Sequence, residues 1–424
     1  MATFLKEPPH QPGEGADAVR RTVSEILASV EKEGVAAVRR YSAQFDRWDP
    51  PSFRVDRVAL DRAADEVEPG LRRQIDFAAE QIRGFALHQR ASMQDLEVQT
   101  LPGVTLGHRH IPVASVGSYS PGGLYPLIAS SLMTVVTPKA AGVGRVVAVA
   151  PPREGRGIHP PQLYAMVSAG ADEIFCMGGV QALAALAFGI EGLEPVDMVV
   201  GAGNAYVAEA KRQLFGTVGI DLLAGPTEIL VIADETADPR LVAADLLGQA
   251  EHGPTSPATL ITTDEATGRA VMREVDRWLE GEWPTTPIAG PAWRDYGTVV
   301  LCDSAEEAAR LSDQYAPEHL EVQTRDPEWY LEHLRNYGSL FLGRHSTVAF
   351  SDKSIGTNHV LPTRRAARYT GGLWVGKFLK TQTYQRVTAE GSELVAPSTS
   401  AIADAELMFG HALTARLRLH LPGD

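Results

Sequence analysis

The stretch Arg145-Val-Val-Ala-Val-Ala150 decides the fold, because it opens a long alternation of strand-like and helix-like segments. Short apolar runs of this kind predict buried strands, and the segments between them predict helices. The alternation continues with predicted strands at 173–177 and 197–200 and predicted helices at 128–140, 162–169, 181–188 and 204–215. Alternating strands and helices predict a parallel sheet that is covered by helices.

A second alternation begins at Glu228-Ile-Leu-Val-Ile-Ala-Asp234. It contains predicted strands at 258–263, 298–302 and 339–343, and predicted helices from 239, at 265–279 and at 305–315. Two comparable units indicate duplication of a domain type, although no repeat in the sequence establishes it. The predicted fold class is α/β, with two Rossmann-like, doubly wound domains, a small N-terminal arm and a C-terminal helical tail.

The segments outside these alternations set the predicted boundaries. Apolar residues recur at helical spacing over 17–45 and 60–88, with a break at Pro69-Gly70, and both stretches are expected to be scaffold. After residue 372 a strand-like piece at 381–387 precedes a predicted helix from about 398 to 417. The predicted units are an arm (1–16), a first α/β domain with most of the candidate site residues (17–118 with 228–373), a second α/β domain (119–227) and a tail (374–424).

Composition excludes several classes of function. The chain has 424 residues and a net charge of −14, which argues against nucleic acid or an anionic membrane as the main partner. Its two cysteines, Cys176 and Cys302, lie in apolar runs and are expected to be buried thiols. The sequence has no signal-peptide pattern and no apolar run of membrane-spanning length, so we expect a cytoplasmic protein.

Two glycine-rich loops are candidates for ligand contact. The loop Gly117-Ser-Tyr-Ser-Pro-Gly-Gly123 allows close approach of a ligand to the backbone, or forms a plain tight turn. The loop Gly201-Ala-Gly203-Asn204 joins a predicted strand to a helix, where a phosphate can bind. It lacks the third glycine of the dinucleotide fingerprint, so any NAD site here is incomplete and atypical.

Polar residues gather at four further places. Gln249 and His252 are three residues apart near a helix end, where they either hold a metal or form an exposed polar terminus. Glu318 and His319, in a predicted loop, are two proton acceptors or an ordinary surface pair. The polar segment 351–363 contains Asp352 and His359, and the tail contains Glu406 and His411.

Together, Gln249, His252, Asp352 and His411 form a nitrogen and oxygen ligand set suited to zinc. Glu318 and His319 supply the proton acceptors. The sequence has no Gly-x-Ser-x-Gly elbow, and neither cysteine suits catalysis. The residues alone therefore predict a metal-assisted enzyme on two α/β domains.

The sequence resembles the histidinol dehydrogenase family over nearly its whole length. The segments that carry the resemblance occur in the family's order: Gly-Ser-Tyr119-Ser-Pro-Gly-Gly, Gly-Gly-Val-Gln181-Ala-Leu-Ala, Gly-Ala-Gly-Asn204-Ala-Tyr-Val, Ala-Gly-Pro-Thr227-Glu, Gly-Gln249-Ala-Glu-His252-Gly-Pro, Ala-Pro-Glu318-His319-Leu, Gly-Thr-Asn-His359-Val-Leu-Pro-Thr and Gly-His411-Ala.

The resemblance implies roles for particular residues. It implies one zinc per subunit, NAD as cofactor, and a homodimer in which the tail reaches the partner's site. The implied positions are zinc ligands at Gln249, His252, Asp352 and His411, proton acceptors at Glu318 and His319, NAD contacts at Tyr119, Gln181 and Asn204, and substrate contacts at Thr227, His359 and Glu406.

The implied chemistry is a four-electron oxidation of a primary alcohol through the aldehyde to the carboxylate, with two NAD reduced in turn. The zinc favours the substrate alkoxide. His319 takes the hydroxyl proton, and Glu318 activates the water that adds to the aldehyde.

Three positions depart from the family's usual pattern. Ala129 stands where the family has the first of two serines, Thr227 replaces a serine, and Lys353 replaces a tyrosine after the metal aspartate. A lysine beside zinc suits an anionic substrate, unless its side chain points to solvent. These features resemble the branch that oxidises 2,3-dihydroxypropane-1-sulfonate to sulfolactate; histidinol is the alternative substrate. A zinc hydrolase and a non-catalytic binding protein are alternatives of another class.

Overall fold

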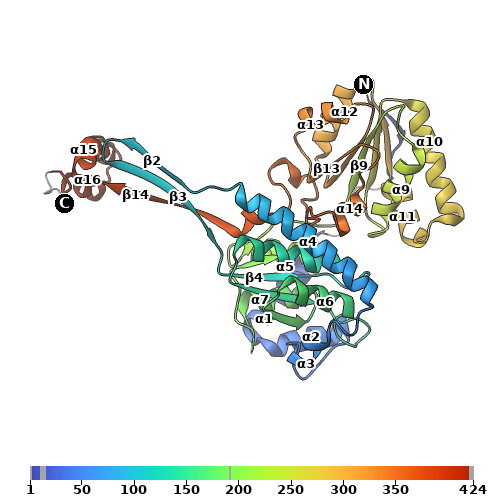
Figure 1. Cartoon of the computed structure of the whole chain (residues 1–424), viewed down its shortest axis with the longest axis horizontal. Helices are drawn as coiled ribbons and strands as arrows, with labels where there is room; N and C mark the ends of the chain where they lie inside the picture. Colours follow the sequence, from blue (N-terminus) through green and yellow to red (C-terminus); the bar gives the residue numbers. More distant parts are fainter. Residues whose placement is uncertain (1, 10–15, 191, 420–424) are drawn as a thin grey trace.

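The computed structural model describes residues 2–9, 16–190 and 192–419, and in these residues it contains three sheets (Figure 1). Two of the sheets lie in α/β units, and the third forms an arm that projects from them. The α/β class predicted from the sequence is confirmed. The Rossmann-like description of both units stays a prediction.

The smaller α/β unit contains a parallel five-stranded sheet with the order β6-β5-β4-β7-β8. Its strands are β4 (Ser115–Tyr119), β5 (Arg145–Ala150), β6 (Glu173–Cys176), β7 (Met198–Val200) and β8 (Gly219–Ile220). The helices between them are α5 (Ile128–Ala141), α6 (Pro160–Ala169), α7 (Gly179–Phe188) and α8 (Ala205–Leu214). Buried apolar side chains cover both faces of the sheet, which is the expected core of a parallel sheet between helices.

The larger unit contains a six-stranded sheet with the order β1-β11-β10-β9-β12-β13. Its strands are β1 (Thr3–Lys6), β9 (Ile229–Ala233), β10 (Ala258–Thr262), β11 (Thr298–Leu301), β12 (His319–Gln323) and β13 (Ser339–Leu342). Its helices are α9 (Pro239–Ala250), α10 (Glu265–Arg277), α11 (Thr286–Tyr296), α12 (Ala305–Tyr315), α13 (Pro327–His333) and α14 (Val348–Lys353). A π-helical turn follows α10 (Trp278–Glu282), and two 3₁₀ turns lie at Ala366–Arg368 and Val375–Phe378.

The predicted arm at 1–16 is partly a strand. Thr3–Lys6 pairs antiparallel with β11 and forms one edge of the larger sheet, whereas residues 10–15 lie outside the described residues. The alternating strands and helices have the predicted types, with bounds that differ by a few residues. Cys176 and Cys302 are both buried free thiols, as predicted.

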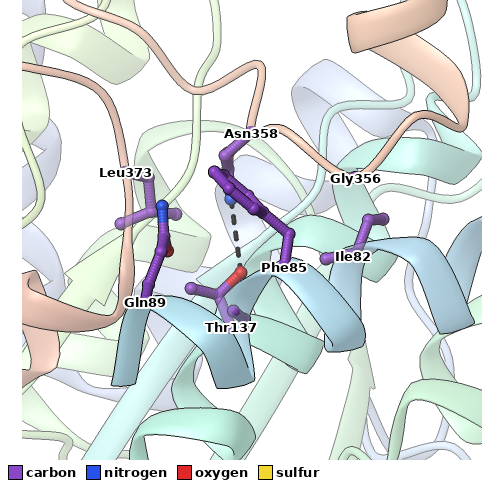
Figure 2. Close-up of a pocket in the computed structure, with 8 residues that line it drawn as sticks. Ile82, Phe85, Gln89, Thr137, Gly356, Asn358 and Leu373 are labelled. Atoms are coloured by element: carbon purple, nitrogen blue, oxygen red, sulfur yellow. Dashed lines mark hydrogen bonds between the residues drawn. The ribbon is translucent and has the colours of Figure 1, made fainter. Parts of the chain in front are cut away.

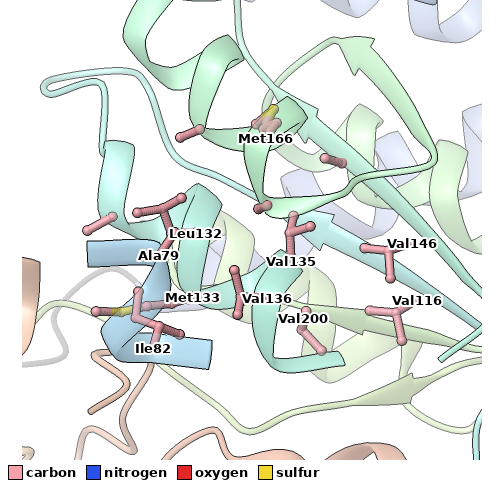
Figure 3. Packing of buried hydrophobic residues seen from close by; sticks show 14 of the residues in the cluster. Ala79, Ile82, Val116, Leu132, Met133, Val135, Val136, Val146, Met166 and Val200 are labelled. Atoms are coloured by element: carbon pink, nitrogen blue, oxygen red, sulfur yellow. The ribbon is translucent and has the colours of Figure 1, made fainter. Parts of the chain in front are cut away.

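The N-terminal helices pack on the smaller unit, which differs from the predicted grouping of residues 17–118 with 228–373. These helices are α1 (Ala16–Glu33), α2 (Val35–Asp46), α3 (Arg57–Arg62) and α4 (Pro69–Ala91). The α1 helix contacts α7 and α8, and α4 contacts α5 and α6; Figure 3 shows Ala79 and Ile82 of α4 beside Leu132 and Met133 of α5. An apolar helical stripe predicts burial but not which sheet it covers, so the sequence could not decide this grouping.

The projecting arm joins two distant parts of the chain (Figure 1). It contains the antiparallel strands β2 (Leu96–Leu101), β3 (Val104–Pro112) and β14 (Leu379–Val387), in the order β14-β3-β2. The helices α15 (Ala389–Ala405) and α16 (Phe409–Arg416) lie at its far end. The single helix predicted over 398–417 is wrong, because the backbone turns at Leu407, which has a φ of 60°.

None of the helices in the described part of the chain has the length and the apolarity that crossing a bilayer requires.

Candidate active site

The candidate site lies at the amino ends of β9 and β12, which are neighbours in the larger sheet. His319, the first residue of β12, pairs with Ile229. Glu318 immediately precedes β12, and Thr227 lies two residues before the start of β9. The sequence predicted that Glu318 and His319 lie in a loop; pairing with β9 instead makes His319 part of the sheet. Both side chains are buried.

Glu318 and His319 nevertheless approach each other. The Oε2 atom of Glu318 lies 3.4 Å from Nδ1 of His319, and it accepts hydrogen bonds from the Thr227 hydroxyl (2.5 Å) and the Glu228 N–H (3.0 Å). Nδ1 of His319 also lies 3.1 Å from the Glu228 carbonyl oxygen. The two predicted proton acceptors therefore form one buried cluster with Thr227.

Three of the four predicted metal ligands converge beside this cluster. Nε2 of His252 lies 3.7 Å from Oδ2 of Asp352, and Nε2 of His319 lies 3.7 Å from Oδ1 of the same aspartate. The amide nitrogen of Gln249 donates to Thr227 and lies 3.4 Å from Nδ1 of His319. Oδ1 of Asp352 is buried and has no hydrogen-bond partner among the described residues, so this oxygen is available to a cation.

Local structure explains this convergence and corrects two details. Gln249 is in the last turn of α9, which ends at Ala250, whereas His252 lies in the turn beyond the helix rather than in its last turn. Asp352 and Lys353, predicted in an irregular segment, end the short helix α14. The strand β12 and these two helices therefore supply the cluster.

Charges within the cluster shift its pKa values. Burial alone lowers the pKa of His319, but the negative charges of Glu318 and Asp352 outweigh it and raise the pKa well above its usual value. Burial raises the pKa of Asp352, but His319 more than offsets this and holds the pKa well below its usual range. Burial lowers the pKa of His252 and of His359.

His359 and Lys353 both contact Asp352. Nδ1 of His359 is 3.1 Å from the Asp352 carbonyl oxygen, and its Nε2 is 2.7 Å from the hydroxyl of Ser130 on α5. The Lys353 ammonium is 3.9 Å from Oδ2 of Asp352, although 58% of the lysine side chain is exposed. The smaller unit thus contributes Ser130 to the site, and Ala129 beside it is buried.

A small cavity of about 10 Å³ lies between α4 and the loop that carries Gly356 and Asn358 (Figure 2). The Asn358 amide donates to the Thr137 hydroxyl at 3.3 Å across this cavity. This contact holds the loop before His359 against α5.

The two tail residues are not brought to the site by their own chain. Glu406 and His411 are exposed at the far end of the arm (Figure 1). Within the described residues of one chain, no group of three or more His, Cys, Asp or Glu side chains is arranged to hold a metal.

The predicted NAD contacts lie at the carboxyl end of the smaller sheet, around the ends of β4, β6 and β7. Tyr119 is buried and accepts a hydrogen bond from the Gly179 N–H (3.3 Å), and burial raises its pKa to about 12. Gln181 is buried and donates to Asp46 at 3.0 Å. Asn204 caps α8 by accepting from the N–H groups of the next turn. In this structure, the three side chains therefore make hydrogen bonds within the chain that stabilise the fold.

A cavity of about 330 Å³ lies between the two α/β units. Its lining includes Glu228, Arg364, Tyr296 and the α8 residues Ala205 and Arg212. Burial, followed by the charge of Glu318, raises the pKa of Glu228 to about 7.

Sequence reasoning did not single out Glu228 or Ser130 as site residues. Each of them follows a position that the sequence did indicate, Thr227 and Ala129 respectively. Their place next to these motifs is the sequence feature that could have identified them. Asp46, which binds Gln181, lies in a helix with no motif and gave no signal.

Comparison with known proteins identifies the family. The family model of histidinol dehydrogenase matches residues 10–419. A "Histidinol dehydrogenase homolog" of Shouchella clausii is 53% identical over 95% of this chain and 94% of its own length. The "Sulfopropanediol 3-dehydrogenase" of Ruegeria pomeroyi is 46% identical over 98% of this chain and 96% of its own length.

The fold agrees with this match. The crystal structure of histidinol dehydrogenase from Elizabethkingia anophelis has a TM-score of 0.90 and 34% identity, and the match covers 97% of this chain and 94% of that one. The chain therefore belongs to the histidinol dehydrogenase family, whose members are NAD-dependent oxidoreductases that in general contain zinc, form dimers and act on small molecules.

Proposed function

We propose that this protein is a zinc-dependent, NAD-linked dehydrogenase that oxidises a primary alcohol through the aldehyde to the carboxylate. The observation that carries the proposal is the convergence of Gln249, His252 and Asp352 beside the Glu318–His319 pair. A binding protein has no need for two buried proton acceptors beside a metal site, and a zinc hydrolase, which could use them, would not reduce NAD.

The donor set fits zinc. Gln249, His252 and Asp352 supply amide, imidazole and carboxylate ligands, and the unpartnered Oδ1 of Asp352 is available to a cation. We propose His411 of a second copy as the fourth ligand. When bound, zinc lowers the pKa of a coordinated hydroxyl group and NAD accepts the hydride.

The side chains of the cluster carry the protons. The neutral form of His319 accepts the hydroxyl proton of the alcohol in the first oxidation, because its Nε2 has no hydrogen-bond partner among the described residues. Glu318 accepts a proton from the water that adds to the aldehyde, and its contacts with Thr227 and the Glu228 N–H hold the carboxylate in place. Two hydrides pass in sequence to two NAD, one water enters and three protons are released, which balances the oxidation from alcohol to carboxylate.

We propose a sulfonated diol, 2,3-dihydroxypropane-1-sulfonate, as the substrate. The Lys353 ammonium lies beside the metal aspartate, where it can pair with a fixed anion on the substrate. The amino group of histidinol is a cation and would be repelled by the same lysine. We propose that Thr227, His359 and the partner's Glu406 complete the substrate contacts, and that Tyr119, Gln181 and Asn204 lie beside the NAD site.

The decisive experiment is NADH production from the sulfonated diol and from histidinol, each at saturating NAD with zinc present. We expect activity with the sulfonated diol, loss of activity on chelation, and recovery on addition of zinc. Activity with histidinol alone would contradict the proposed substrate. Absence of NADH with any alcohol would contradict the dehydrogenase chemistry.

Lys353→Met tests the anion contact. Because the lysine is partly exposed, its contact with the substrate is partly screened by solvent. We therefore expect the KM for the sulfonated diol to rise about 3–10-fold, which is more than the loss of a fully exposed ion pair would cause and less than the loss of a buried one. Lys32→Met, on the exposed last turn of α1, is the control and should not change KM. An unchanged KM in the Lys353 variant would show that this lysine does not contact the substrate.

A further inference from the structure

A second buried carboxyl cluster lies one layer behind the candidate site. Asp245 precedes Gln249 by one helical turn on α9, and Glu321 follows His319 by two residues on β12. Residues at these spacings share one face of a helix or of a strand. The contact between Gln249 and His319 joins α9 to β12. The pair Asp245–Glu321 joins the same two elements, one helical turn and two strand residues further from the metal ligands.

The two carboxyl groups also bind the start of α14. The Thr347 hydroxyl donates to Oδ1 of Asp245 at 3.0 Å, and the Val348 N–H donates to Oε1 of Glu321 at 2.9 Å. Asp352 is one helical turn further along α14. The Gln323 amide donates to Asp245 at 2.9 Å and lies 3.4 Å from Glu321.

The charges of this cluster require a shared proton. Glu321 is 1% exposed, and the side chains of Glu321 and Asp245 are hydrogen-bonded to each other. In the described part of the chain their remaining partners are Gln323, Thr347 and Val348, none of which is a cation. Two carboxylates in contact cannot both ionise without strong repulsion, and burial raises the pKa of each.

We propose that Asp245 and Glu321 form a proton-sharing carboxyl pair that positions the zinc ligands. The pair joins the three elements that carry the site: α9 with Gln249, β12 with His319, and α14 with Asp352. Both residues are positioning residues, since they act through these elements rather than on the substrate. The inference rests on the proposed zinc site.

The test compares Glu321→Gln with Glu321→Met. The glutamine amide can donate to Asp245 and its carbonyl can accept from the Val348 N–H, so this variant should bind zinc like the natural protein. Methionine has a similar size but makes neither hydrogen bond. We expect its zinc affinity to fall about 10–100-fold, the usual effect of losing a group that orients a metal ligand.

Zinc affinity is measured by competition with a chromophoric chelator, with the Tm of each metal-free variant recorded alongside. If Glu321→Met does not fold, Thr347→Val replaces it, because it removes one donor to Asp245; Thr347→Ser, which keeps the hydroxyl, is its control. We then expect weaker zinc binding in the valine variant alone.

Unchanged zinc affinity in folded Glu321→Met would overturn the positioning role, as would equal losses in the glutamine and methionine variants. Failure of the natural protein to bind zinc would overturn the proposed metal site, and this role with it. The failures of the two proposals are therefore distinguishable.

Discussion

Glu228 has an environment that links stability to pH. Its backbone N–H binds Glu318, its carboxylate accepts a hydrogen bond from the Arg364 N–H at 3.1 Å, and its side chain lines the larger cavity. Burial and then the charge of Glu318 raise its pKa from 4.5 to about 7. The folded state therefore binds this proton more tightly than the unfolded chain.

The raised pKa predicts the direction of the pH effect. The stabilisation from this proton is fully present below about pH 4.5 and is lost as the pH rises through about 7. The side chain of the Glu228→Gln variant cannot ionise. As the pH rises from 5 to 8, we therefore expect its free energy of unfolding to increase by about 1–3 kcal/mol relative to that of the natural protein, given partial solvent screening. Thermal unfolding at several pH values measures this gain.

The control for this experiment is Glu31→Gln, which removes an exposed carboxylate on α1. Its Tm should follow the natural protein at every pH. A constant difference in Tm between Glu228→Gln and the natural protein would contradict the assignment of this titration to Glu228.

At the scale of single residues, the sequence indicated which motif side chains lie close together, but not which side chains from distant segments contact them. Gln249, His252 and Asp352 converge as expected, because each follows or ends a helix beside the same strand. The contact of Gln181 with NAD stays a prediction; in this structure its amide donates to Asp46, which lies far away in the sequence. A motif identifies a residue but does not show the hydrogen-bond partners that distant segments bring to it.

At the scale of elements, a buried ion pair shapes the turn between β7 and α8. Lys211 of α8 and Asp221, which follows β8, form an ion pair whose side chains are fully buried. The lysine donates to the Gly201 carbonyl oxygen at 2.7 Å, and the aspartate accepts from the Gly201 N–H at 2.8 Å. Gly201 has a φ of 126°, a conformation that favours glycine. The pair thus holds the loop that leads to Asn204.

Lys211→Met tests this arrangement. Loss of the lysine leaves the Asp221 charge buried without a partner, so we expect the free energy of unfolding to fall by about 3–5 kcal/mol. The double variant with Asp221→Asn removes that charge and should recover part of the loss. Both are measured by denaturant unfolding of the purified protein.

The surface pair Lys139–Asp172 provides a comparison, since its aspartate is 40% exposed. Lys139→Met should lower the free energy of unfolding by less than about 1 kcal/mol, as is usual for exposed ion pairs. If both variants lost the same free energy of unfolding, the burial of Lys211 would not determine how much its ion pair contributes to stability.

Elements could be predicted from the sequence where the pattern is local. Strand β5 and helix α12 have the predicted bounds because apolar periodicity and helix caps are local signals. Pairings between distant segments could not be predicted in this way. Strand β14 pairs with β3, and Thr3–Lys6 pairs with β11, although hundreds of residues separate each pair.

At the scale of the whole molecule, the arm carries two predicted site residues away from the rest of the site. Its end exposes large apolar side chains at Leu407, Met408, Phe409, Leu413 and Leu417. Contiguous exposed apolar groups of this kind mark interaction surfaces. We therefore expect the arm to dock on a second copy of the chain and to supply His411 and Glu406 to its site.

Mixed dimers test this exchange. His411→Asn and Glu318→Gln should each be inactive as homodimers, because every site then lacks a ligand or a proton acceptor. If the arms exchange, a dimer of one chain of each variant contains one site with both defects and one intact site. Such dimers, purified through two different tags, should have about half the activity of the natural dimer. A dimer of a His411→Asn chain and a chain with both substitutions has no intact site and is the control. Activity no higher than this control would mean that each chain completes its own site, and the arm would then have to fold back onto its own α9 and α14.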